Sequence, residues 1–184
     1  MPAKNIREFN KKKPIIHKDV FIDPSAVVTG DVELQDDASI WPHTSIRGDL
    51  LKITIGKGSN IQDGSVLHTT HISKYNPKGA TLTVGDNVTV GHAVTLHGCT
   101  IGNQCLIGMN SCIMDEVIIE DNVFVAAGSL VTPGKILKSG YLYQGSPAKQ
   151  ARELTEEELS FFTYSAKHYI LLKNQHISEL SLNK

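Results

Sequence analysis

The chain has 184 residues and a formal net charge of −1, with 18 Lys and Arg against 19 Asp and Glu. This length fits one domain, and the near-neutral charge argues against nucleic acid as a partner. No apolar run is long enough to span a membrane, and the first 14 residues lack the apolar core of a signal peptide, so we expect no membrane partner. Cys99, Cys105 and Cys112 form no C-x-x-C pair, which favours buried free thiols and a cytoplasmic protein.

Residues 1–19 show no regular pattern and are expected to be irregular. Over residues 20–135 an aliphatic residue recurs mostly at intervals of six, at Ile22, Val28, Leu34, Ile40, Ile46, Ile55, Ile61, Leu67, Val84, Val90, Leu96, Ile101, Ile107, Ile113, Ile119, Val125 and Val131. A helix needs apolar spacings of three and four, whereas short strands joined by tight turns can use a period of six. Three such repeats make one triangular coil, and stacked coils form a parallel β-helix. We therefore predict an all-β fold, the left-handed parallel β-helix known for hexapeptide repeats, and the strict register disfavours a β-sandwich.

The repeat is interrupted once and then ends. Residues 69–82 form a loop insertion with a turn signal at Asn76-Pro77-Lys78-Gly79. Residues 136–184 begin with an irregular strap over 140–149. Thr155 and Glu158 then have the spacing of a capping box, and apolar residues follow at helical intervals. A C-terminal α-helix over about 155–180 should pack on the β-helix of its own or a neighbouring subunit.

Three histidines occupy defined places in the predicted coils. Leu67 and Leu96 fall at the same corner of successive coils, so His68 and His97, which follow them, stack about 4.8 Å apart between backbones. That spacing lets two imidazoles converge on one metal ion at about 2.0–2.1 Å. His92 belongs to a different face and cannot reach the same ion within one subunit. A homotrimer solves this problem, because the His68/His97 face of one subunit meets the His92 face of the next.

The same columns place further polar residues near the histidines. Arg47 lies beneath His68, while Gln62 and Asp63 lie beneath His92. Arg47 and Asp63 could pair across the interface, either around the site or as an ordinary interface salt bridge, and Asp49 could join them. Gln62 could hydrogen-bond a metal-bound water. Three neutral imidazoles with an open position are typical of a catalytic zinc site, which produces hydroxide at neutral pH.

The residues that surround these positions match a known family. Arg47-Gly-Asp49, Asn60-Ile-Gln62-Asp63-Gly64, Leu67-His68 and Gly91-His92-x4-His97-Gly98 resemble the γ-class carbonic anhydrases, and most closely the small bacterial γ-carbonic-anhydrase-like proteins. The resemblance runs from about Val20 to the C-terminal helix. It implies a homotrimer with Zn²⁺, or alternatively Fe²⁺ or Co²⁺, held by His68, His92 and His97 at each interface. Arg47, Asp49, Gln62 and Asp63 would surround the metal, the reaction would be reversible hydration of CO₂ to bicarbonate, and Tyr141 resembles the family's site tyrosine.

Two positions depart from the archaeal enzyme of that family. Leu50 stands where that enzyme has a glutamate, and Thr69-Thr70-His71 stands where it has a proton-shuttling glutamate. His71 could shuttle protons, because an unperturbed histidine titrates near pH 6.5, or it could be a loop residue without a role. Two other functions stay open. One is an acyl-CoA-dependent acyltransferase, since Gly145-Ser-Pro-Ala-Lys149 resembles the closing strap of such enzymes; the other is a metal-binding homologue without activity.

Overall fold

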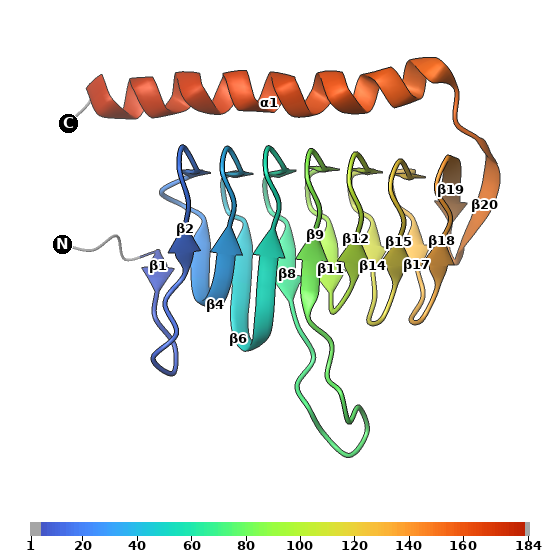
Figure 1. Ribbon diagram of the computed structural model, residues 1–184, viewed down its shortest axis with the longest axis horizontal. Helices are drawn as coiled ribbons and strands as arrows, with labels where there is room; N and C mark the ends of the chain where they lie inside the picture. The colour runs from blue at the N-terminus through green and yellow to red at the C-terminus, as the bar shows by residue number, and fades with distance from the viewer. Residues whose placement is uncertain (1–4, 183–184) are drawn as a thin grey trace.

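The computed structural model describes residues 5–182 and shows a stack of triangular coils with one long helix lying along it (Figure 1). The prediction of a left-handed parallel β-helix is confirmed. One sheet of eight strands forms the face beneath the helix: β3 (Phe21–Ile22), β5 (Ser39–Ile40), β7 (Asn60–Ile61), β10 (Thr89–Val90), β13 (Leu106–Ile107), β16 (Phe124–Val125), β19 (Tyr141–Gly145) and β20 (Ala148–Glu153).

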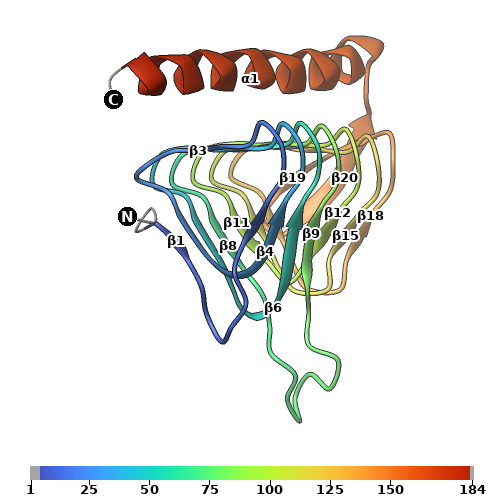
Figure 2. The same ribbon diagram turned by 60° about the vertical axis from the view of Figure 1, so that its left-hand side comes forward.

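The second sheet covers the other two faces of the triangle (Figure 2). Its twelve strands are β1 (Ile6–Arg7), β2 (Ile15–Ile16), β4 (Val27–Leu34), β6 (Ser45–Ile55), β8 (Val66–His68), β9 (Leu82–Val84), β11 (Thr95–His97), β12 (Thr100–Ile101), β14 (Cys112–Ile113), β15 (Ile118–Ile119), β17 (Leu130–Val131) and β18 (Ile136–Leu137). The long strands β4 and β6 run around a corner and join the two faces. The first part of β6 pairs with β8 and its last part with β9.

The core is the column of aliphatic side chains that the six-residue period places inside each coil. Ile40, Ile61, Val90 and Ile107, for example, stack on successive coils and are fully buried. Each coil therefore buries several aliphatic side chains, at roughly 1.5–3 kcal/mol each. The chain can change direction sharply between these strands because residues such as Asn122 at the turns adopt a positive φ, here 56°.

Both ends of the stack differ from the sequence expectation. Strands β1 and β2 lie in the segment that was expected to be irregular, and both pair with β4. At the other end, the expected irregular strap contains β19 and part of β20, which form an antiparallel hairpin on β16. In each case the open edge of a parallel stack carries unpaired backbone groups, and an added strand satisfies them.

Helix α1 (Glu156–Leu182) packs along the eight-stranded face of its own subunit. The predicted capping box is confirmed, because the Thr155 amide donates to the Glu158 carboxylate at 2.9 Å and the Glu158 amide donates to Thr155 Oγ1 at 3.2 Å. Phe162 and Ala166 are buried against the solenoid, and the buried Lys173 forms an ion pair with Asp37 at 2.9 Å. In the described part of the chain, no helix is long and apolar enough to cross a membrane.

Candidate metal centre

His68 and His97 face each other at one corner of the solenoid. The register of β8 and β11 pairs them directly, as the coil arithmetic predicts. His68 Nδ1 lies 3.1 Å from His97 Nε2, and the ring centroids are 5.1 Å apart. Two imidazole nitrogens bound to one tetrahedral zinc ion lie about 3.3–3.4 Å apart. The spacing of the two nitrogens therefore suits two ligands of a shared metal ion.

Aspartates hold the outer nitrogen of each of these rings. His68 Nε2 lies 3.0 Å from Asp49 Oδ1, and His97 Nδ1 lies 2.8 Å from Asp115 Oδ1. A carboxylate oxygen accepts hydrogen bonds, so each ring donates its N–H outward and turns a lone pair toward the other ring. Two lone pairs at this distance repel unless a cation or a proton lies between them. This donor set fits a metal ion, because metal-binding histidines usually donate their second nitrogen to a carboxylate or a carbonyl.

Arg47 and Asp49 support the His68 side of this pair. Arg47 is the register partner of His68, and its Nη1 donates to Asp49 Oδ2 at 2.6 Å. Burial raises the pKa of Asp49, but hydrogen bonds from Arg47 and His68 outweigh burial and leave the pKa lowered. Burial is also the main reason that the pKa of His68 is lowered. Both shifts favour an ionised Asp49 beside a neutral imidazole, which is the form that binds metals.

His92 lies at a different corner, in the turn that follows β10. It is exposed, and its Nδ1 lies 2.9 Å from Asp63 Oδ2. The buried Gln62 lies one coil below His92. Its Nε2 donates to Asn60 Oδ1 at 3.0 Å. His92 precedes β11, and His97 is the last residue of that strand. Among residues 5–182, no group of three candidate ligands gathers within one subunit.

A cavity of about 400 Å³ adjoins His92 between α1 and the strands beneath it. Its walls include Gln62, Met109, Phe161 and Tyr169. Burial raises the pKa of Tyr169, and the negative charge of Asp63 adds to that effect. Sequence reasoning missed Tyr169 as a site residue, although it lies on the apolar stripe that predicts the helix. It also missed Asp115, which the next repeat places one coil above His97.

Tyr141 and His71 do not line the cavity beside His92. Tyr141 is on β19, which β13 and β16 separate from β10 in the same sheet, so it lies three coils or about 14 Å along the stack. Tyr169 of α1 lines the cavity beside His92, and Tyr141 does not. His71 is exposed at the start of the loop between β8 and β9.

Comparisons with known proteins identify a matching repeat family and relatives that cover most of the chain. The family model described as bacterial transferase hexapeptide (six repeats) matches residues 13–48 and 98–133. Protein YrdA of Escherichia coli (strain K12) is 52% identical, and the match covers 95% of each chain. Gamma carbonic anhydrase 2, mitochondrial, of Arabidopsis thaliana is 44% identical over 92% of this chain and 61% of the plant protein.

A solved structure shows the same fold under a different functional name. The crystal structure of a putative acetyltransferase from Bacillus cereus superimposes with a TM-score of 0.88 at 39% sequence identity, covering 94% of this chain and 96% of the other. Similar chains therefore carry names from two classes of enzyme, and the choice between these classes depends on the chemistry of the site.

Proposed function

The chain belongs to the γ-carbonic-anhydrase-like proteins of the hexapeptide-repeat family, and from this membership we propose that it is a homotrimeric, metal-dependent enzyme that hydrates CO₂ reversibly to bicarbonate. Zinc as the metal, with Fe²⁺ or Co²⁺ as alternatives, and a cytoplasmic location are parts of the same proposal. His68 and His97 of one subunit and His92 of the next would be the ligands.

One observation carries this proposal. Each of the three histidines has one ring nitrogen within 3.0 Å of an aspartate oxygen, namely His68 with Asp49, His97 with Asp115 and His92 with Asp63. The other nitrogen of each ring is then the lone-pair donor, and a carboxylate fixes the ring's orientation. A single base for acyl transfer needs one such histidine. Three histidines with the same pairing fit three ligands of one ion.

The surrounding residues would divide the remaining work. When bound, the metal supplies Lewis-acid activation of water near neutral pH. The Gln62 amide, held by Asn60, would orient a water or CO₂ at the His92 side by hydrogen bonding. Arg47 would offset the negative charge of bicarbonate and pair with Asp63 across the interface. His71 would carry the released proton to solvent, since it is exposed and an imidazole can both accept and donate a proton.

Metal analysis together with a stopped-flow CO₂ assay on anaerobically purified protein tests the proposal. We expect one metal ion per subunit, a trimer in sedimentation velocity, and hydration that disappears on chelation and returns with Zn²⁺ or Fe²⁺. A metal-free monomer would refute the proposal. A trimer with metal but no hydration at any pH would support the inactive metal-binding homologue, which the departures at Leu50 and His71 favour.

An acyltransferase is the second candidate, because a close structural relative bears the name of a putative acetyltransferase. In that case metal-free protein would consume acetyl-CoA in the presence of an acceptor, and chelation would leave the rate unchanged. Measuring both reactions on the same preparation, with and without chelator, separates the two classes.

A further inference from the structure

A tongue formed by residues 70–80 projects from the solenoid between β8 and β9 (Figures 1 and 2). Its base is closed by two backbone hydrogen bonds between Thr70 and Ala80, at 2.9 and 3.1 Å. The Asn76 amide donates to Glu116 Oε1 at 3.0 Å, which ties the tongue to a higher coil of its own subunit. These contacts give the tongue a defined direction.

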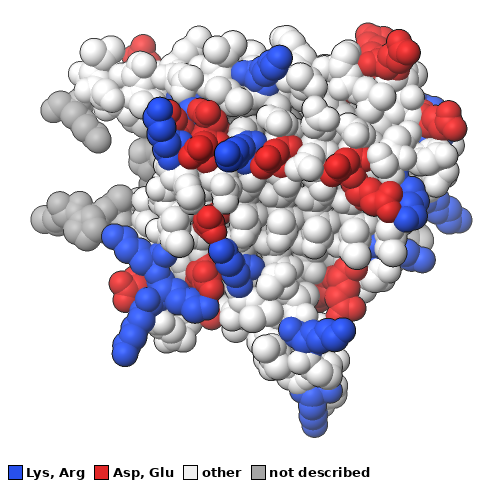
Figure 3. Space-filling model, viewed as in Figure 1, with Lys and Arg blue, Asp and Glu red and all other residues white. Residues whose placement is uncertain are grey.

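The tongue carries both exposed apolar side chains and basic side chains. Ile72 is 62% exposed and Tyr75 is 86% exposed. Residues 70–80 include Lys74 and Lys78 and contain no acidic residue, and Figure 3 shows this positive charge on the protruding part of the molecule. Large apolar side chains held out in water on an anchored segment are typical of an interaction site.

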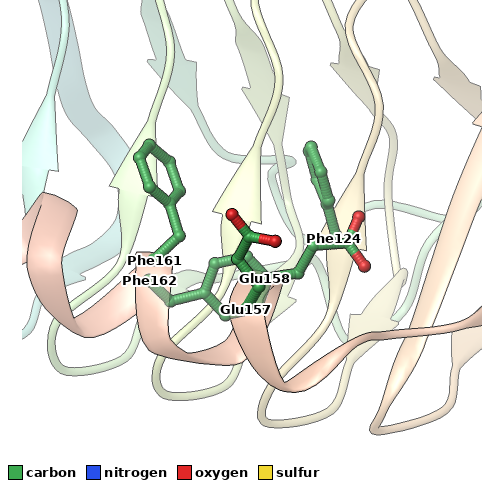
Figure 4. Close-up of a pocket in the computed structure, with 5 residues that line it drawn as sticks. All are labelled: Phe124, Glu157, Glu158, Phe161 and Phe162. Atoms are coloured by element: carbon green, nitrogen blue, oxygen red, sulfur yellow. The ribbon is translucent and has the colours of Figure 1, made fainter.

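A groove that could accept the apolar side chains of the tongue lies beneath the first half of α1. The cavity beside His92 shares Phe124 and Phe161 with a second pocket of about 190 Å³, and we call the two together the α1 groove. Figure 4 shows the second pocket, where Phe124, Phe161 and Phe162 lie beside two glutamates at the start of the helix. Phe161 is 50% exposed. The α1 groove is therefore largely apolar, with aromatic side chains from α1 and β16, and one end carries Glu157 and Glu158, of which Glu158 is paired with Arg152.

The proposed trimer brings these two features together. The tongue leaves the solenoid two residues after His68, and the α1 groove begins at His92. If the His68/His97 corner of one subunit meets the His92 corner of the next, the tongue emerges beside the next subunit's α1 groove. Each arm of the tongue has about five residues and can extend about 15 Å from the solenoid.

We propose that the tongue of one subunit docks in the α1 groove of the next, with Ile72 and Tyr75 against Phe161. Lys74 and Lys78 then approach the acidic first turn of α1. This contact closes the cavity beside His92 from solvent with a second copy of the chain, and it places His71 at the entrance. The inference rests on the proposed function, because it uses the subunit pairing that completes the three-histidine site.

Disulfide cross-linking between separately labelled subunits tests the contact. One variant carries Tyr75→Cys and the other Phe161→Cys, both in a Cys112→Ala background, because Cys99 and Cys105 are already buried. Both substituted positions are exposed, so we expect the variants to fold. After mixed refolding and mild oxidation, we expect a covalent dimer that contains one subunit of each kind. In the matched control, Ile136→Cys replaces Phe161→Cys; Ile136 is also an exposed apolar residue, at 54%, but it lies on β18.

The outcomes separate this inference from the proposed function. A mixed covalent dimer with Phe161→Cys that is lost with Ile136→Cys supports docking in the α1 groove. Equal cross-linking to both positions, or none in a protein that is a metal-loaded trimer, overturns the inference and leaves the proposed function standing. A metal-free monomer without cross-links overturns both. Sedimentation velocity and metal analysis on the same samples identify which case applies.

Discussion

The two corners that carry the histidines differ in how firmly a single subunit holds the imidazole rings. At the first corner, His68 and His97 face each other and aspartates hold both rings, and the His68 side chain is only 15% exposed. At the second corner, the His92 side chain is 48% exposed beside an open apolar cavity. The first corner is preorganised within the subunit, whereas the second is open to solvent. Under the proposed function, the coil sets the geometry of the first two ligands and assembly of the trimer would complete the site.

The largest expected effect comes from breaking the preorganised corner. His97→Ala should remove the metal and abolish hydration, because His68 and His92 alone leave two ligands from two subunits. Metal analysis and stopped-flow kinetics measure the result. The matched control is His17→Ala, since His17 also pairs with a carboxylate, Glu33 at 3.1 Å, but lies outside both corners. Retention of stoichiometric metal by the His97 variant would contradict the assigned ligand set.

A smaller loss should follow when the ring of His97 is kept and its partner is changed. Asp115→Asn should weaken metal binding by about 10–100-fold, because the carboxylate fixes the orientation and basicity of the imidazole. Competition with a chelator measures the affinity. Glu116→Gln is the control, because the neighbouring carboxylate bonds to Asn76 of the tongue and to no histidine that is assigned to the metal. Equal affinities for the two variants would remove Asp115 from the site.

Removal of the Arg47 side chain should weaken the contact between subunits in the proposed trimer. Arg47→Ala should weaken the trimer by about 2–5 kcal/mol per interface if its pairing with Asp63 is buried there. Sedimentation equilibrium measures this change. Lys52→Ala serves as the control, because Lys52 pairs with Glu33 inside its own subunit. An unchanged association constant would show that Arg47 serves only its own Asp49, to which it donates at 2.6 Å.

The smallest effect is expected from Glu158, which lies in the first turn of α1. Hydrogen bonds from Arg152 and Thr155 lower the pKa of Glu158 to about 2, compared with a usual value of 4.5. The ionised form is therefore favoured in the folded chain, and its stabilising effect is present above pH 4.5 and is lost as the pH falls toward 2.

Thermal unfolding between pH 5 and pH 2 tests this effect. The melting temperature of the native protein should fall more steeply with acid than that of Glu158→Gln, which has no carboxyl group to protonate at this position. Parallel curves for the two proteins would show that the helix start contributes no pH-dependent stability. The His68/His97 corner should keep its metal affinity at pH 7 in the variant, since it lies away from the helix start.

The pattern of residues predicts the backbone of the site well. The six-residue period, once the extra residues before Ile55 and the insertion at 69–82 are set aside, places Arg47 under His68 and His68 under His97. The strand register shows the same pairs. It also predicts that His92 points from another face. Register follows from the period because each aliphatic residue must stack on the one below it, and the residue after it then has a fixed neighbour. The capping box at Thr155 is predictable for a similar reason, since both partners lie within one helical turn.

What the sequence determined was the coil, its register and the separation of the histidines, because these depend on a repeat that is local and strict. Only the tertiary structure decided that Asp115 holds His97, that Tyr169 and not Tyr141 lines the cavity, and that short strands cover both ends of the stack. Those features depend on how side chains rotate between coils and on where α1 lies across the sheet. The repeat places Asp115 one coil above His97, but it does not fix how the two side chains turn toward each other, and no spacing within the chain specifies where α1 lies across the sheet.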